Sequence, residues 1–417
     1  MSTQQPVLQS SRRLSASTRM VLLLATGLLI NYVDRGNLAT AAPLIQDQLH
    51  LSHTQLGYLL SAFYFSYVAA MAPVGWISER YGAHRILGVG VAIWSLATML
   101  TGFAAGFASL LALRLLLGLG ESAGFPCSSK LIASAVEPAG IGTANGMIAF
   151  GYLVGPALGT LAGGLLMSFI GWRPVFVLFG VLSALWLWPW SHVQIEPLAR
   201  SASSLTEGPA FGEILRQRGL WGASLGHFAS NYTFYFILSW LPEYLVKERG
   251  FSLQAMAGVA GIAYLVNAVA ALLGGWGADL WIRSGRSASA IYKSLMAVGH
   301  VASIAVMAGM SLLSIRDAVI CLFVYQIFVG LASPGIFAIP QIMAGPTAAG
   351  RWVGVQNTCG NVAGIIAPAL TGISVDATGS FTSAFGLASL VNVLGLLGWL
   401  VILPRVAPLR WKLLRAQ

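Results

Sequence analysis

The chain has 417 residues, of which 57% are hydrophobic and only 9% are Asp, Glu, Lys or Arg. A soluble domain carries about 25% charged residues, so this composition excludes a soluble enzyme, a disordered protein and a secreted disulfide scaffold. The net charge of +10 does not indicate nucleic-acid binding, because the Lys and Arg residues lie in short gaps between long apolar runs instead of forming a basic face in water. We therefore expect an all-α membrane protein.

Twelve stretches of the chain are long and apolar enough to cross a bilayer as helices, which takes about 20 residues. In chain order these predicted spans are residues 20–40, 56–77, 86–105, 108–130, 142–167, 174–190, 220–242, 255–280, 292–312, 318–340, 352–373 and 381–403. The polar residues 1–19 precede them, and no small-residue cleavage pattern follows the first apolar run. We expect this run to be a retained helix and not a cleaved signal peptide.

The positive charges predict the orientation of the chain, since Lys and Arg are concentrated in cytoplasmic loops. With the N-terminus in the cytoplasm, most of the 23 Lys and Arg residues fall in the cytoplasmic tails and loops. The loops on the other side hold Arg173, Lys247, Arg249 and Arg316. This asymmetry predicts that both termini are cytoplasmic, and it explains the basic isoelectric point without an anionic partner.

An internal repeat divides the chain into two halves. Matching loops follow the second and the eighth span: Gly75, Glu79, Arg80, Gly82 and Arg85 in the first, and Gly275, Asp279, Arg283, Gly285 and Arg286 in the second. Further residues recur at one common offset: Gly118, Phe125, Asn145 and Pro156 match Gly330, Phe337, Asn357 and Pro368. A duplicated six-helix unit predicts parallel halves with a binding site between them near the middle of the membrane.

We accordingly expect five regions. These are a cytoplasmic tail over 1–19, a six-helix half over 20–190, a cytoplasmic linker over 191–218, a second six-helix half over 219–404 and a cytoplasmic tail over 405–417. The linker is polar and mixed in charge, and we expect no chemical role for it.

The repeated loop resembles the signature loop of the major facilitator superfamily, with Glu79 in place of the more usual Asp. Gly75 and Gly275 are small enough to let helices approach closely. Glu79 and Asp279 can each face the positive end of a helix in the opposite half, and the arginines hold the loop at the cytoplasmic surface. A simple positively charged cytoplasmic loop is the alternative interpretation, which the recurrence of the pattern disfavours.

Four ionisable residues lie within predicted spans of the first half: Asp34, Arg35, Arg114 and Glu121. Such a residue costs about 2.5–3.5 kcal/mol at the centre of a membrane helix, so it normally faces the protein interior and has a function. Two arginines in a low-dielectric cavity attract an anion, and a guanidinium fits a carboxylate with two hydrogen bonds. Carboxyl groups in the same cavity favour their neutral form, so they can take up and release protons. The alternative is two internal ion pairs that only hold the helices together.

Several stretches resemble the anion:cation symporter family within that superfamily. They include residues 31–39, 114–126, 231–250 and 354–368, so the resemblance extends over the whole chain. Members of that family move organic anions such as sugar acids, tartrate or phthalate together with protons. The resemblance implies that Arg35 and Arg114 lie at the substrate carboxylate, and that Asp34 and Glu121 are the proton-linked acids. It also implies further pocket contacts: Tyr32, Tyr67 and Asn361.

Two more predictions concern the pocket. A polar stripe with four-residue steps follows the seventh span: His227, Asn231, Tyr235 and Ser239. We expect Asn231 and Tyr235 to face the cavity and His227 to be a hydrogen-bonded packing residue. Tyr152 stands where the sugar-acid branch of that family often has Gln, and its single hydroxyl and large ring leave room for a smaller or aromatic acid.

The expected function is secondary active transport: proton-coupled symport of a small organic anion, such as a sugar acid, an aromatic acid or a small dicarboxylate, across the plasma membrane by alternating access. The alternatives are an exporter or antiporter on the same fold and a transport-inactive ligand sensor. The six His and three Cys residues are scattered, so we expect no enzyme activity, metal, cofactor or disulfide. We expect a multi-pass protein of the bacterial inner membrane, functional as a monomer, with the anion, protons and lipid as partners.

Overall fold

The computed structural model describes residues 15–51, 53–193, 208–245, 249–250, 253–310, 313–378 and 380–411, and every regular element among them is helical. The first group comprises α1 (Ala16–Leu49), α2 (His53–Tyr81), α3 (Ala83–Thr101), α4 (Phe107–Glu121), α5 (Gly124–Ala135), η1 (Pro138–Gly140), α6 (Ile141–Ile170), α7 (Trp172–Leu185) and α8 (Leu187–Ser191). The second comprises α10 (Phe211–Leu215), α11 (Arg218–Glu243), α12 (Leu253–Arg283), α13 (Ala288–Gly309), α14 (Ile315–Ala332), α15 (Gly335–Ala344), α16 (Ala349–Thr378), α17 (Phe381–Leu397) and η3 (Gly398–Ile402).

Nine helical segments of the described chain are long and apolar enough to cross a membrane. The other three predicted spans correspond to α2, α11 and α16, which are helices of 29, 26 and 30 residues. Their length suffices for a bilayer, but over the described residues they do not reach the same hydropathy. Of these three helices, α16 packs against both α2 and α11.

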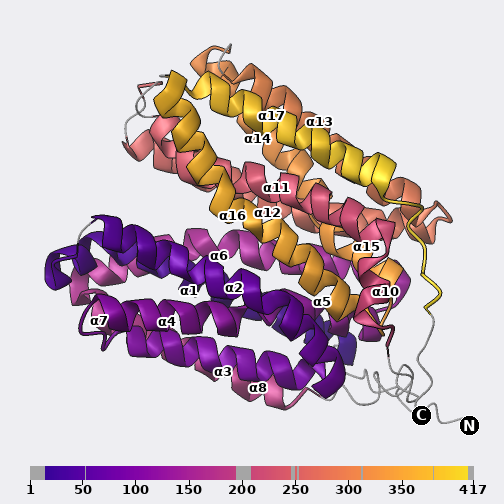
Figure 1. Cartoon of the computed structure of the whole chain (residues 1–417), viewed down its shortest axis with the longest axis horizontal. Helices are drawn as coiled ribbons and strands as arrows, with labels where there is room; N and C mark the ends of the chain where they lie inside the picture. The colour runs from indigo at the N-terminus through magenta and orange to yellow at the C-terminus, as the bar shows by residue number, and fades with distance from the viewer. Residues whose placement is uncertain are drawn as a thin grey trace, which may run out of the picture.

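The helices form two lobes that lie side by side (Figure 1). In the first lobe α1 packs on α6, and α3 packs on α4 and α7. In the second lobe α11 packs on α16 and α17, and α14 packs on α12 and α13. The most extensive contacts between the lobes are those of α2 with α16 and of α6 with α12, and α5 and α15 add further contacts. This arrangement follows the internal repeat, in which α2 corresponds to α12 and α6 corresponds to α16.

Large apolar side chains lie on the outer surface, whereas several ionisable side chains of the predicted spans are found inside. Phe169 and Trp188 are 78% and 74% exposed, while Asp34, Arg114 and Glu121 are buried. This distribution is the reverse of that in a soluble protein, and it is expected where the surrounding solvent is lipid.

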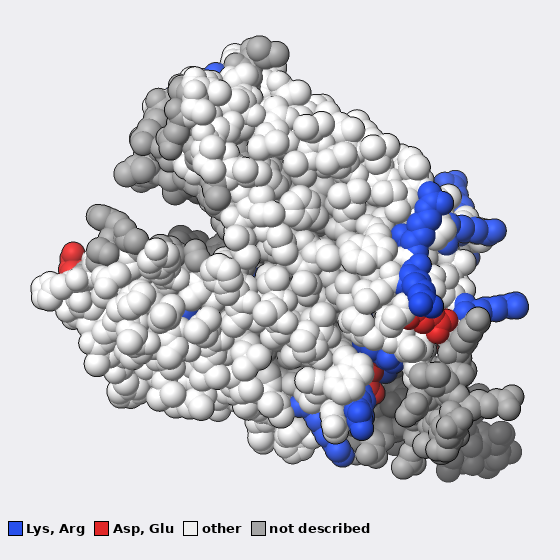
Figure 2. Space-filling view, in the orientation of Figure 1, with Lys and Arg blue, Asp and Glu red and all other residues white. Residues whose placement is uncertain are grey.

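The two ends of the molecule differ. Most of the visible Lys and Arg side chains gather at the end that carries α5, α10 and α15 (Figures 1 and 2), and we call it the basic end. At the opposite end, Figure 2 shows the surface hollowed between the two lobes. The lobes are therefore in contact at the basic end and separated at the other.

Two predicted spans are broken at equivalent points of the repeat. The fourth span, predicted as one helix over 108–130, ends as α4 at Glu121 and resumes as α5 at Gly124. The tenth span, predicted over 318–340, ends as α14 at Ala332 and resumes as α15 at Gly335. In the second lobe the break falls at Pro334, whose ring removes a backbone donor. In the first lobe the residues at the break are Ser122 and Ala123, and Pro126 follows in the first turn of α5. The Ala123 N–H donates a short-range bond to the Gly120 carbonyl oxygen at 3.4 Å.

Two glycines of the repeated loop lie where the lobes touch. A Cβ atom on Gly275 of α12 would overlap the carbonyl oxygen of Gly142 on α6. One on Gly75 of α2 would lie 2.5 Å from the carbonyl oxygen of Gly350 on α16. Real Cβ contacts are not this short, so only glycine permits the backbones to approach this closely at the basic end.

We expect Gly275→Val to lower the melting temperature of the protein in detergent, because the added side chain would push α12 away from α6. Overpacking of this kind costs about 1–3 kcal/mol. The matched control is Gly277→Val on the same helix, where an added Cβ would meet nothing within 4 Å. Thermal unfolding of both variants measures the difference, and equal melting temperatures would contradict the importance of this close approach.

Candidate functional site between the lobes

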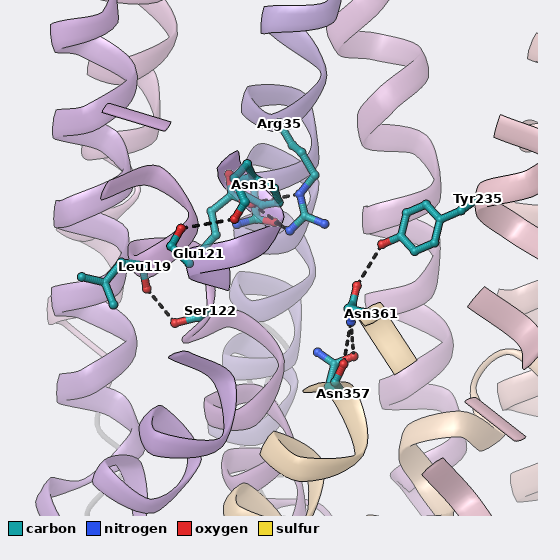
Figure 3. Close-up of polar contacts among 10 residues, drawn as sticks. Asn31, Arg35, Leu119, Glu121, Ser122, Tyr235, Asn357 and Asn361 are labelled. Atoms are coloured by element: carbon teal, nitrogen blue, oxygen red, sulfur yellow. Dashed lines mark hydrogen bonds and ion pairs between the residues drawn. The ribbon is translucent and has the colours of Figure 1, made fainter. Parts of the chain in front are cut away.

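A nearly buried ion pair joins α1 to α4. Arg35 donates from Nε and Nη2 to one oxygen of Glu121, Oε2, over 3.0 and 2.8 Å. Its Nη2 also donates to Asn31 Oδ1 at 3.2 Å (Figure 3). The Arg35 side chain is 11% exposed and that of Glu121 is fully buried, and Glu121 Oε1 has no hydrogen-bond partner among the described residues. The guanidinium is therefore held in place while part of it can still be reached.

Three aromatic rings surround this guanidinium. Its Cζ atom lies 4.3 Å from the ring centre of Tyr32, 4.7 Å from that of Phe63 and 4.7 Å from that of Tyr67. These distances are within the range of cation–π attraction. Phe63 and Tyr67 are four residues apart on α2, which places them on the same helix face. The rings restrict the access of water to the cation and so strengthen its attraction for an anion.

Arg114 is a second buried cation on α4. It precedes Glu121 by seven residues, or about 10 Å along the helix axis. Its Nε donates to the Leu59 carbonyl oxygen at 3.4 Å, and its Cζ lies 5.2 Å from the ring centre of Phe63. No carboxylate of the described chain lies within 4 Å of it. A buried guanidinium without a carboxylate partner is costly, so Arg114 also favours an anion nearby.

Asp34 lies apart from the two arginines. Its Oδ2 accepts a hydrogen bond from the Ser183 hydroxyl of α7 at 2.6 Å. Successive residues of a helix point about 100° apart, so Asp34 and Arg35 face different neighbours although they are adjacent in sequence. Of the two internal ion pairs considered above, the described residues contain one, Arg35–Glu121. The structure therefore pairs Arg35 with Glu121, places Arg114 against the same Phe63 ring as Arg35, and directs Asp34 towards α7.

The second lobe supplies a phenol and two amides. Tyr235 on α11 donates to Asn361 Oδ1 on α16 at 2.8 Å. Asn361 Nδ2 donates to the carbonyl oxygen and the side-chain oxygen of Asn357, each at 2.9 Å (Figure 3). Asn231 is half-buried one helical turn before Tyr235. Tyr235 and Asn361, both predicted for the pocket, thus contact each other.

Aromatic contacts cross between the lobes. Phe125 on α5 stacks on Phe337 on α15, with ring centres 4.8 Å apart and planes at 13°. Tyr64 on α2 meets Tyr235 edge-on at 5.8 Å. Within the first lobe, Tyr152 on α6 lies 5.7 Å from Phe125. Phe125 and Phe337 are equivalent residues of the repeat, so their stack lies where the two halves face each other.

Phe63 and the Phe125–Phe337 pair are absent from the predicted site. A signal existed for Phe63, since it lies one helical turn from Tyr67, but an apolar ring on a membrane helix normally indicates lipid contact or packing. The phenylalanine pair was visible in the repeat, where matching positions near a symmetry axis are candidates for mutual contact.

The carboxylates of the signature loop lie at the N-terminal ends of helices from the opposite lobe. Asp279 accepts from the backbone N–H groups of Gly142 and Thr143, at the start of α6, over 2.9 and 2.6 Å. Glu79 accepts from the backbone N–H of Arg351, near the start of α16, at 2.9 Å and also pairs with its guanidinium. Both contacts have the geometry in which a helix N-terminus stabilises an anion.

Arg351 also holds the linker, for which we expected no chemical role. Its Nη1 donates to the Pro209 carbonyl oxygen at 2.5 Å, and its Nη2 donates to the Thr347 carbonyl oxygen at 3.4 Å. One guanidinium thus connects both lobes and the linker. Residues 194–207 of the predicted linker lie outside the described residues.

The remaining residues of the signature loop lie at the surface of the basic end. Gly82 has a φ of 93° at the turn between α2 and α3, a conformation that favours glycine. Arg80 and Arg85 are exposed, and the Arg80 guanidinium lies 5.6 Å from the ring centre of Trp76. These positions suit contact with water or lipid headgroups and not with the central site.

No metal centre is found in the part of the chain that the structure describes, where no three His, Cys, Asp or Glu residues could hold an ion together. His227 is buried with its ring centre 5.5 Å from that of Phe337. Its Nδ1 has no hydrogen-bond partner among the described residues. His227 therefore packs against the Phe337 ring without a hydrogen bond from this nitrogen.

Two helical lobes that touch at one end, with a nearly buried cation between aromatic rings, are the features of a membrane transporter. The sequence profile of the Major Facilitator Superfamily matches residues 24–368. The chain belongs to that superfamily, and it is a transporter and not an enzyme.

Its relatives include named transporters of acids. A hexuronate transporter of Bacillus subtilis is 31% identical over 88% of this chain and 90% of its own length. A D-galactonate transporter of Escherichia coli is 28% identical, covering 92% and 94%. Among solved structures, the human organic anion transporter MFSD10 superposes with a TM-score of 0.74 at 15% identity, covering 93% of this chain and 100% of that one. At that identity the structural likeness shows the fold alone.

Proposed function

We propose that the protein carries a small organic anion, a carboxylate, together with protons across the bacterial inner membrane. The observation that carries this proposal is the Arg35–Glu121 pair, in which two guanidinium donors converge on one carboxylate oxygen. A substrate carboxylate needs the same donors, so it competes directly with Glu121. The relatives named for hexuronate and galactonate support an acid as the substrate.

Proton coupling follows from this competition. While Glu121 is ionised, it neutralises Arg35 and occupies its donors. A proton on Glu121 removes that negative charge, so the guanidinium becomes available to the substrate. When the proton leaves, Glu121 recovers Arg35 and displaces the anion. We propose Asp34 as a second proton-linked acid, which acts through α1 and Ser183 because it does not contact Arg35.

The orientation and the moving parts complete the proposal. The excess of positive charge assigns the basic end and both termini to the cytoplasm, so the hollow between the lobes faces outward. The halves 20–190 and 219–404 then rock about the site, and the contacts of Glu79 and Asp279 form the cytoplasmic gate that must open. The site and the gate are both formed within one chain, so a monomer suffices.

Uptake into proteoliposomes tests the proposal. Labelled sugar acids, aromatic acids and small dicarboxylates are supplied outside, with an inward, an outward or no proton gradient. We expect accumulation above the external concentration only with the inward gradient, abolished by a protonophore. Accumulation driven by an outward proton gradient would indicate an antiporter instead. Binding of an anion without flux would indicate a ligand sensor.

A further inference from the structure

We propose that the transported anion is an aromatic carboxylate, whose ring packs among Tyr32, Phe125 and Tyr152 while its carboxylate pairs with Arg35. This inference rests on the proposed function and narrows it to one class of substrate. It is carried by the aromatic lining of the site and by the hydrogen bonds that its amide oxygens already accept.

The first set of rings, which we call the first ring cluster, consists of Tyr32, Phe125 and Tyr152. Each ring of this cluster contacts the other two: the centres lie 6.5 Å apart for Tyr32 and Phe125, 5.4 Å for Tyr32 and Tyr152, and 5.7 Å for Phe125 and Tyr152. The planes are inclined at 89°, 36° and 69° in the same order. The cluster therefore presents both edges and faces, the surfaces that another aromatic ring prefers.

A second ring cluster, Phe63, Tyr64 and Tyr67, lies along α2. Phe63 is 5.1 Å from each of its two partners. Arg35 lies between the clusters, since its guanidinium contacts Tyr32 of the first and Phe63 and Tyr67 of the second. An anion bound to Arg35 therefore has aromatic rings on both sides. A flat apolar ring attached to the carboxylate fits these surroundings.

The oxygen atoms of the nearby amides already accept hydrogen bonds, so they are poorly placed to accept from the hydroxyl groups of a polyhydroxylated acid. Asn31 accepts from Arg35, and Asn361 is bonded to both Tyr235 and Asn357. A sugar acid carries several hydroxyl groups, and each that is buried against a ring without a partner loses its bonds to water. Phenol hydroxyls, the half-buried Asn231 and two amide donors without a partner among the described residues, Asn31 Nδ2 and Asn357 Nδ2, remain for such groups. An aromatic acid with few hydroxyls avoids this penalty.

Binding calorimetry on the full-length protein in detergent tests this inference. Binding is measured, and not uptake, because benzoic acid crosses bilayers unaided. Three monocarboxylates are compared: benzoate, cyclohexanecarboxylate and D-gluconate. We expect benzoate to bind about tenfold more tightly than gluconate, and cyclohexanecarboxylate to bind more weakly than benzoate, since one aromatic pair contributes about 0.5–1.5 kcal/mol, or about 2- to 12-fold.

Variants of Tyr152 test whether this ring contributes to the preference for benzoate. Tyr152→Leu is expected to weaken benzoate binding about fivefold and to leave gluconate binding nearly unchanged, whereas Tyr152→Phe keeps the ring and should retain benzoate affinity. Tyr58→Leu is the control, because it is the same substitution at a tyrosine that is 62% exposed. Melting temperatures establish that each variant is folded.

The outcomes separate this inference from the function on which it rests. Gluconate binding as tight as benzoate, or tighter, overturns the aromatic substrate and leaves organic anion transport intact. Equal affinity for benzoate and cyclohexanecarboxylate also overturns it, because any apolar group would then suffice. If no organic acid is bound or taken up in either assay, both proposals fail.

Discussion

Replacing Arg35 with Gln is expected to reduce uptake of the organic anion by about 100-fold or more. The change removes both donors from Glu121, which is buried and has no second partner for its other oxygen in the described chain. In the proposed complex the change also removes the donors to the substrate carboxylate, and truncating one partner of a buried hydrogen-bonded charge pair costs binding about 2–5 kcal/mol, where each 1.4 kcal/mol corresponds to a factor of ten. Initial rates of uptake into proteoliposomes measure the loss.

Arg35→Lys should not restore transport, because a single ammonium group cannot direct two fixed donors to one oxygen or lie flat between three rings. Arg316→Gln provides the control, since Arg316 is exposed. Uptake by Arg35→Gln within a few-fold of the unchanged protein would show that Arg35 does not bind the substrate.

Replacing Glu121 with Gln is expected to abolish accumulation driven by a proton gradient while exchange of labelled for unlabelled substrate continues. The amide resembles a protonated carboxyl group, so Arg35 stays available to the anion and no proton can be released. Substrate binding should then lose its dependence on pH. The measurement compares uphill uptake with counterflow in the same proteoliposomes.

Asp34→Asn offers a comparison within the same helix. We expect it to impair accumulation as well but to leave the affinity for the anion unchanged, because Asp34 contacts Ser183 and not Arg35. Uphill uptake that survived in both variants would exclude the coupling scheme. A large loss of anion affinity in Asp34→Asn alone would instead place Asp34 in the substrate site.

Much of the fold is predictable from the pattern of apolar residues. Membrane helices need long apolar runs and have few alternatives, so the helices along the chain could be recognised from sequence. The breaks after Glu121 and after Ala332 were not predicted, because an apolar run does not reveal where its backbone turns. The second break falls at Pro334, and the first is followed by Pro126 in the first turn of α5, but neither proline by itself shows that the helix ends there.

The site was predictable in its residues and less so in its contacts. Arg35 and Glu121 were identifiable because a charged side chain in a membrane helix is energetically costly and normally has a function. Their pairing was one option among several, and the bond between Asp34 and Ser183 could not be foreseen, since hydroxyl groups are common in membrane helices. Likewise, nothing in the sequence distinguishes Arg351 from the other positively charged residues between predicted spans, and its contacts with Glu79 and Pro209 depend on the packing of the two lobes.

The amino-acid sequence alone determined three features: that the protein is surrounded by lipid, that it consists of a duplicated unit and that ionisable groups lie within the predicted spans of its first half. It could do so because hydropathy, repeats and charge can be read directly from the order of the residues. The tertiary structure alone decided which groups meet: Arg35 with Glu121 among three rings, Asp34 with Ser183, and Phe125 with Phe337 across the lobes. Such contacts join residues far apart in the chain. They depend on how each packed helix is rotated about its axis and how deeply it lies. A shift of one residue along a helix changes the direction of the side chain by about 100°.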